Sequence, residues 1–163
     1  MGIRSQNIQV RVTPGQKAAL RRLAKRAMQD LSSYILSRSL PADGARFDTL
    51  VSNLRDDPNP RFVLAALNDF LGELVAVQLA EAVRHADLSG LSEFLQNYLA
   101  AMVEQACALK RAAPPPWVRD VSPLVEPYFA GDLKALRPHL LRASPVAFKR
   151  RNLFVDSSIG ARV

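Results

Sequence analysis

The sequence predicts a mainly α-helical protein with a small N-terminal module of one strand and two helices and a larger helical C-terminal domain. Apolar and polar side chains alternate at residues 7–12, which is the period of a half-buried strand. From residue 14 onward, apolar side chains recur every three or four positions, which is typical of amphipathic helices. Residues 1–40 also carry the whole net charge of +7, which sets them apart from the rest of the chain.

The predicted strand has an apolar and a polar face. The apolar face consists of Ile8, Val10 and Val12, and the polar face consists of Asn7, Gln9 and Arg11. One strand on two helices leaves backbone N–H and C=O groups unpaired, and about 40 residues bury too small a core to fold alone. Pairing with the same strand of a second chain would remove both defects, so we expect a homodimer.

The first helix is expected to begin at Pro14. Thr13 is suited to cap it, and proline fits the first helical position because no backbone donor is needed there. Its apolar stripe consists of Leu20, Leu23, Ala24, Ala27 and Met28.

The second helix is expected at residues 32–40, after a turn at 29–31. Ser32 is a suitable cap, and Pro41 ends the helix. Tyr34 and Ile35 supply apolar surface in its first turns.

Two stretches of this module carry a family resemblance. Residues 7–17 read Asn-Ile-Gln-Val-Arg-Val-Thr-Pro-Gly-Gln-Lys, and residues 30–38 read Asp-Leu-Ser-Ser-Tyr-Ile-Leu-Ser-Arg. Together they resemble the ribbon-helix-helix family of Arc, MetJ and CopG-type repressors and many antitoxins. In that family two chains form an antiparallel ribbon in the major groove of DNA, and the second helix holds a phosphate at its N-terminus. The family often has glycine in the turn where this chain has Gln29-Asp30.

The resemblance implies a role for each position. It makes Asn7, Gln9 and Arg11 the base-reading residues. The expected phosphate contacts are Arg4, Thr13, Lys17, Ser32 and Ser33. The expected dimer core consists of Ile8, Val10, Val12, Leu20, Leu23, Tyr34 and Ile35.

Charge is unevenly distributed along the chain. Residues 1–40 contain one acid, Asp30, and eight basic residues: Arg4, Arg11, Lys17, Arg21, Arg22, Lys25, Arg26 and Arg38. The other residues contain equal numbers of acids and bases. Such segregation is typical of a module that binds a polyanion. For the four bases at 21–26 alone, an ordinary solvated helix face explains the pattern equally well.

Beyond this module, residues 41–45 contain proline and glycine and predict a linker. We expect a helical partner-binding domain at 46–163. Apolar stripes predict its helices at 47–54, 62–86 and 89–109, and short joints between them allow a bundle-like core.

The last third of the chain is less regular. A proline-rich segment spans 113–127, and consecutive prolines predict an extended path up to Trp117. A helix is expected at 133–141, bent or restarted at Pro138. The candidate partner contacts are Trp117, Phe148, Lys149, Arg150, Arg151 and Phe154. Trp117 fits either an interface anchor or a core plug, with the plug slightly favoured. The basic cluster at 149–151 fits a second nucleic-acid contact, a patch for an acidic partner or ordinary surface charge.

No motif points to an enzyme, a metal or a cofactor. His85 and His139 lie far apart without neighbouring ligands, and Cys107 is the single cysteine. The seven glycines form no phosphate-binding loop. No apolar run has the about 20 residues needed to span a membrane, so we expect a cytoplasmic protein.

The resemblance therefore implies a dimeric transcriptional repressor that reads operator DNA and, as many antitoxins of that family do, binds a toxin through its C-terminal domain. Two alternatives stay open. One is a relaxosome accessory protein for plasmid mobilisation, and the other is a helical adaptor that uses its basic N-terminus only as a tether.

Overall fold

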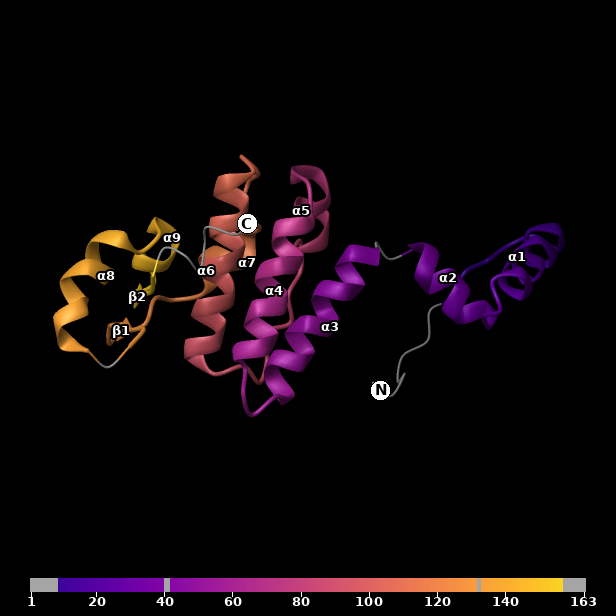
Figure 1. The fold of residues 1–163 in the computed structure, drawn as a ribbon. Helices are drawn as coiled ribbons and strands as arrows, with labels where there is room; N and C mark the ends of the chain where they lie inside the picture. The colour runs from indigo at the N-terminus through magenta and orange to yellow at the C-terminus, as the bar shows by residue number, and fades with distance from the viewer. Residues whose placement is uncertain (1–8, 40–41, 132, 157–163) are drawn as a thin grey trace. The chain divides into compact units, whose positions relative to one another are not determined.

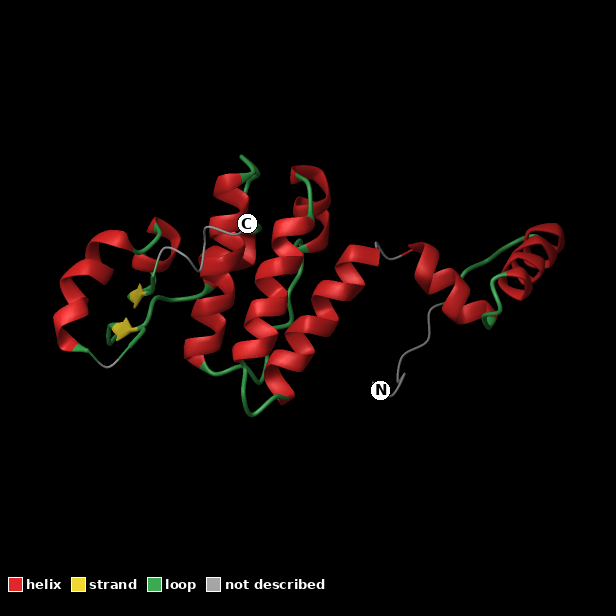
Figure 2. Ribbon diagram, viewed as in Figure 1, coloured by secondary structure: helices red, strands yellow, loops and turns green. Residues whose placement is uncertain are grey.

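The computed structural model describes residues 9–39, 42–131 and 133–156. The chain divides into two compact units, residues 1–40 and residues 41–163. Over the described residues the protein is mainly α-helical, as predicted, with nine α-helices, one 3-10 helix and two very short strands (Figures 1 and 2). None of the described helices has both the length and the apolar composition needed to cross a membrane.

The N-terminal unit consists of α1 (Pro14–Arg26) packed against α2 (Leu31–Ser39). Helix α1 begins as predicted. The Gln16 backbone N–H donates to Thr13 Oγ1 at 3.3 Å, and the Thr13 backbone N–H donates to Gln16 Oε1 at 2.9 Å. This capping box satisfies two donors that the first helical turn leaves unpaired.

The predicted cap of α2 is wrong. Asp30, not Ser32, caps this helix, because the Ser33 backbone N–H donates to Asp30 Oδ1 at 3.0 Å and the Tyr34 N–H donates to Asp30 O at 2.9 Å. Aspartate caps a helix as well as serine does, and here it stands one position before the first helical residue.

Residues 9–12, which belong to the predicted strand, have no regular secondary structure. A strand is defined by its ladder with a second strand, and none of the described residues of this unit supplies one. Residues 7 and 8 lie outside the described part of the chain.

The C-terminal unit is built on four helices: α3 (Ala42–Asp56), α4 (Arg61–Glu73), α5 (Ala76–Ala82) and α6 (Glu93–Leu109). The prediction of a linker at 41–45 is wrong for residues 42–45, which form the first turn of α3. The stretch 62–86, predicted as one helical region, contains two helices separated at Leu74 and Val75. Helix α6 begins at Glu93 and not at residue 89 as predicted, because Ser92 caps it.

A hydrophobic core lies between these helices. Its fully buried side chains include Phe47, Leu54, Leu67, Phe70, Leu79, Leu99 and Val103. The apolar stripes seen in the sequence supply most of them, and their burial provides the main favourable free energy of folding.

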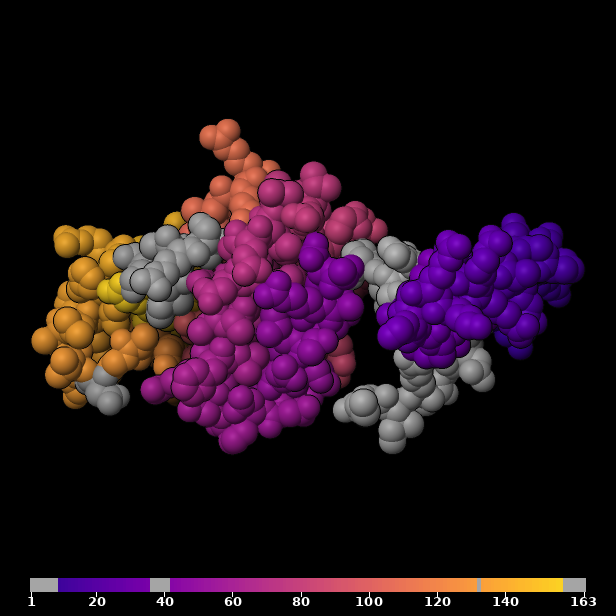
Figure 3. All heavy atoms as spheres, turned by 45° about the vertical axis from the view of Figure 1, so that its right-hand side comes forward, coloured from indigo at the N-terminus to yellow at the C-terminus, as the bar shows by residue number. Residues whose placement is uncertain are grey.

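The rest of the unit consists of short elements: α7 (Pro116–Asp120), β1 (Tyr128–Phe129), η1 (Lys134–Leu136), α8 (Arg137–Ala143), α9 (Val146–Lys149) and β2 (Leu153–Phe154). Strands β1 and β2 pair in parallel, with Tyr128 opposite Leu153. Helix α9 packs on α6, and Figure 3 shows these C-terminal elements, in orange and yellow, against the rest of the unit. The proline-rich segment is extended only as far as Pro115, since Pro116 begins a helical turn.

Candidate nucleic-acid interface

Helix α1 carries two rows of basic side chains at four-residue spacing. One row is Lys17, Arg21 and Lys25, and the other is Arg22 and Arg26. All five side chains are exposed, and none forms an ion pair with a carboxylate of the described residues. Residues four apart on a helix are neighbours, so each like-charged pair destabilises the helix by about 0.2–0.5 kcal/mol. The Arg22 and Arg26 row lies on the side of the helix opposite the buried Ala24, whereas Lys17, seven residues before Ala24, lies on the same side as Ala24.

The dipole of α1 offsets only part of the repulsion between these basic side chains. Lys25 and Arg26 lie in the last turn, where the helix dipole favours positive charge. Lys17 and Arg21 have no such compensation. The helix therefore presents a surface whose electrostatic free energy improves when an anion binds.

The predicted base-reading and dimer residues lie mostly on the surface of the single chain. Gln9 and Arg11 are exposed, as are Val10 (69%) and Val12 (41%). Leu23 is exposed, and Leu20 and Ile35 are half-buried. Arg4, Asn7 and Ile8, whose predicted roles are DNA contact and dimer formation, lie outside the described residues.

Few side chains of the N-terminal unit are buried. Between residues 9 and 35 only Ala24 and Tyr34 are. The side chains described between residues 9 and 35 therefore contribute little apolar burial to offset the conformational entropy lost when the helices form.

The N-terminus of α2, where Ser32 and Ser33 were predicted to hold a phosphate, already contains a carboxylate. The Ser33 N–H donates to Asp30 Oδ1 at 3.0 Å, and Ser33 Oγ donates to Asp30 Oδ2 at 2.5 Å. Ser32 is exposed. A phosphate at this helix end would meet the negative charge of Asp30, so the structure does not favour Ser33 as a phosphate clamp.

The remaining predicted phosphate contacts lie at the start of α1. The Thr13 hydroxyl oxygen accepts the Gln16 N–H, and the side chain of Lys17 is exposed one turn further on. Both therefore lie at the positively charged end of the α1 dipole.

The candidate partner contacts of the C-terminal unit are largely engaged within the chain. Phe148 is 1% exposed and Arg151 is 5% exposed, so neither side chain, predicted as a partner contact, lies on the surface of the single chain. Arg150 Nη1 pairs with Glu104 Oε1 at 2.8 Å, and Lys149 Nζ donates to the Arg142 carbonyl at 2.8 Å. Glu104 precedes the basic cluster by more than forty residues, so nothing in the local sequence indicates this pairing.

The two aromatic candidates also pack inward. Trp117 is half-buried against the core, and its Nε1–H donates to the Val83 carbonyl at 2.8 Å. This placement agrees with a core plug. Phe154 is half-buried and stacks on Phe129 with ring centroids 4.8 Å apart.

The role of Asp30 as the cap of α2 was not predicted from the sequence. The signal was present, because aspartate is a preferred cap and Asp30 stands directly before the helical run. Among the residues that the structure describes, no group of three His, Cys, Asp or Glu side chains is placed to hold a metal ion. Comparison with known proteins gives no match, whether to a protein-family profile, a curated protein or a solved structure.

Proposed function

We propose that the protein is a homodimeric DNA-binding repressor whose N-terminal unit reads duplex DNA with a two-stranded ribbon. The observation that carries this proposal is the two rows of basic side chains on α1, which pair with no carboxylate of the described residues, in a unit where Ala24 and Tyr34 are the only buried side chains between residues 9 and 35. A bound polyanion would neutralise the basic side chains, and a second copy of the chain would bury additional apolar surface.

The electrostatic part of the proposal favours nucleic acid. Five basic side chains on one helix, with Arg11 before it, can neutralise several phosphates and release their counterions. The excess charge of the whole chain belongs to residues 1–40, so the C-terminal unit adds little to this attraction.

The dimer part follows from Val10 and Val12. Both side chains are exposed in the single chain, and they alternate with Gln9 and Arg11. If two copies paired as antiparallel strands, the valines would turn toward the helices and the polar side chains would turn toward DNA. Arg11 would then be able to reach O6 and N7 of a guanine, and Gln9 would suit an adenine.

The test begins with selection of duplexes from a random pool by the full chain. We expect enrichment of a site with two-fold symmetry, because a symmetric dimer reads two half-sites. On that site Arg11→Ala should cost about 1–3 kcal/mol, and on scrambled DNA it should cost far less. Lys25→Ala is the matched control, since loss of a phosphate contact weakens both duplexes equally and reduces the salt slope by about one.

Two results would reject the proposal. The first is a pool that shows no enrichment while the protein still binds all duplexes, which would favour a basic tether. The second is an Arg11→Ala variant that keeps the full preference of the wild-type chain. A toxin partner remains a further proposal, and co-purification with the product of an adjacent gene tests it.

A further inference from the structure

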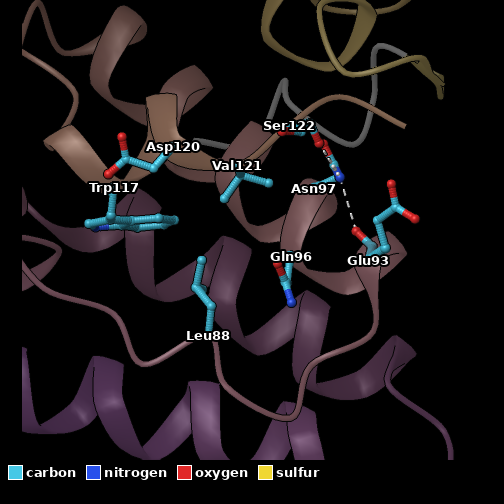
Figure 4. Close-up of a pocket in the computed structure, with 8 residues that line it drawn as sticks. All are labelled: Leu88, Glu93, Gln96, Asn97, Trp117, Asp120, Val121 and Ser122. Atoms are coloured by element: carbon cyan, nitrogen blue, oxygen red, sulfur yellow. Dashed lines mark hydrogen bonds between the residues drawn. The ribbon is translucent and has the colours of Figure 1, made fainter. Parts of the chain in front are cut away.

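The C-terminal unit contains a cavity of about 330 Å³ beside the start of α6 and beside α7. Its walls include Leu88, Trp117 and Val121 as apolar surface, and Glu93, Gln96 and Asp120 as polar groups (Figure 4). Every residue of the lining belongs to this unit, so a ligand of the cavity would not require the N-terminal unit to bind DNA.

Two carboxylates border the cavity and neither is neutralised. Glu93 lies in the first turn of α6 and Asp120 is the last residue of α7. Neither carboxylate forms an ion pair or a hydrogen bond with the described residues, and no Lys, Arg or His lines the cavity. In Figure 4 the two carboxylates lie at opposite sides of the cavity, with Val121 and Leu88 between them.

Two amide side chains, Gln96 and Asn97, also belong to the wall. Asn97 is 0% exposed, and its Nδ2 donates to the Glu93 and Ser122 carbonyls, each at 3.0 Å. Its Oδ1 is buried and has no partner among the described residues. Gln96 Nε2 uses one of its two N–H groups to donate to the Leu91 carbonyl at 2.9 Å. An unpaired amide oxygen beneath the wall makes the potential of the cavity more negative, and a nearby cation would gain from it.

Trp117 supplies an aromatic surface in a fixed orientation. Its Nε1–H is bonded to the Val83 carbonyl at 2.8 Å, so the ring cannot turn freely. The face of an indole ring attracts ammonium groups, and its area also covers alkyl chains.

From these features we infer that the cavity binds an elongated aliphatic cation with an ammonium group near each end. The carboxylates of Glu93 and Asp120 would receive the two charges, and Trp117, Leu88 and Val121 would cover the hydrocarbon between them. A free polyamine carries both ammonium groups on one alkyl chain, and two lysine side chains of one peptide present two ammonium groups on separate alkyl stems.

The experiment uses the full chain and its intrinsic fluorescence, because Trp117 is the single tryptophan. We titrate 1,4-diaminobutane and, separately, butylamine at constant ionic strength. The diamine should produce a saturable change at a concentration about fivefold lower than the monoamine, which is the size of one additional solvent-exposed ion pair.

Variants test the site. Glu93→Gln and Asp120→Asn should each lower the affinity for the diamine to that for the monoamine. Asp69→Asn removes an exposed carboxylate that does not line the cavity, and it should keep the fivefold difference. Circular dichroism confirms that each variant folds.

A capped peptide that contains two lysines identifies the source of the cation. If it binds at least as tightly as the diamine and loses affinity in the same two variants, the site takes lysine side chains. If only the diamine binds, the ligand is a free polyamine. The inference is overturned if the fluorescence does not saturate, if sodium chloride reproduces the change, or if Glu93→Gln and Asp120→Asn keep the fivefold difference.

Discussion

Arg151 is a buried charge that joins three parts of the C-terminal unit. Its Nη2 donates to the Val118 carbonyl at 2.5 Å, its Nη1 donates to the Val121 carbonyl at 3.1 Å, and Glu104 Oε2 lies 3.5 Å away. Burial lowers the pKa of Arg151, and Glu104 opposes that shift. The guanidinium therefore depends on Glu104 for its charge balance.

We predict that Glu104→Gln destabilises the full chain by about 2–4 kcal/mol, because it leaves a buried guanidinium without its counter-charge. Glu81→Gln is the control, since Glu81 pairs with Arg84 on the surface and should cost less than about 1 kcal/mol. Urea unfolding followed by circular dichroism measures both values. Equal losses in the two variants would contradict this account of Arg151.

The thiol of Cys107 should be unreactive in the folded protein. Burial, with Glu104 as the smaller cause, raises the pKa of Cys107 from 9.0 to about 11. Since the thiolate is the reactive form, a disulfide reagent at pH 8 should label Cys107 only in urea. Rapid labelling without urea would show that the thiol is accessible.

The same shift makes stability depend on pH. The folded pKa of Cys107 lies above the unfolded value, so this contribution to stability is complete below pH 9 and is lost as the pH rises toward 11. Cys107→Ala should therefore lose less stability than the wild-type chain between pH 8.5 and 10.5. A parallel decline in both proteins would exclude Cys107 as the cause.

Asp30 should weaken the binding of DNA while it stabilises α2. Asparagine caps a helix as well as aspartate does but carries no charge, so Asp30→Asn should keep the helix and bind all duplexes more tightly, by about threefold to tenfold. Asp43→Asn in the C-terminal unit is the control. Filter binding at two salt concentrations is the measurement, and unchanged affinity of Asp30→Asn would mean that α2 does not approach phosphate.

At the scale of elements, the features that the sequence predicted are local ones. The Thr13 cap and the Pro14 start depend on four consecutive residues, so they could be read directly. The start of α6 was predicted at residue 89, three residues before its cap, because Ser89 and Ser92 are both suitable caps. In the structure the Ser89 backbone N–H and Oγ donate to Asp87 Oδ1 instead. Local sequence could not distinguish them.

Features that join distant residues could not be predicted in this way. The pairing of β1 with β2 and the bonds of Arg151 connect segments more than twenty residues apart. The cation site likewise combines residues from 88 to 122, and none of them is distinctive in its own surroundings.

The proposed ribbon gives the element-scale prediction. Val10→Pro should abolish the dimer, because proline removes a backbone donor from a ladder. Val10→Thr keeps a β-branched side chain and the donor, and it should retain the dimer. Sedimentation equilibrium at micromolar concentration tests both variants, and a wild-type chain that sediments as a monomer would reject the ribbon.

At the scale of the whole molecule, the two units differ in the apolar surface that they bury. The main hydrophobic cluster lies entirely between Phe47 and Val155. None of the described residues of the N-terminal unit belongs to it. The C-terminal unit therefore has the core that independent folding requires.

We predict that a fragment beginning at Ala42 folds alone. It should be helical and melt cooperatively by circular dichroism, because the core remains intact. It should also elute from a heparin column at low salt, because residues 41–163 contain equal numbers of acids and bases. The full chain should need high salt, and equal retention of the two would show that the N-terminal unit is not the main polyanion-binding surface.

The parallel pair β1 and β2 joins the two ends of the segment from Tyr128 to Phe154. Tyr128 N–H donates to the Asn152 carbonyl and Ala130 N–H donates to the Phe154 carbonyl, both at 2.8 Å, while Ser144 Oγ accepts the Val155 N–H at 2.9 Å. Gly131 is exposed, and no atom lies within 4 Å of where its Cβ would be. A protease cut just after Gly131 would therefore leave two fragments that stay associated. The backbone hydrogen bonds between β1 and β2 and the packing of α9 on α6 would hold them together. The same position could accept new chain termini in a circular permutant, or divide the protein into two fragments that reassemble when they are mixed.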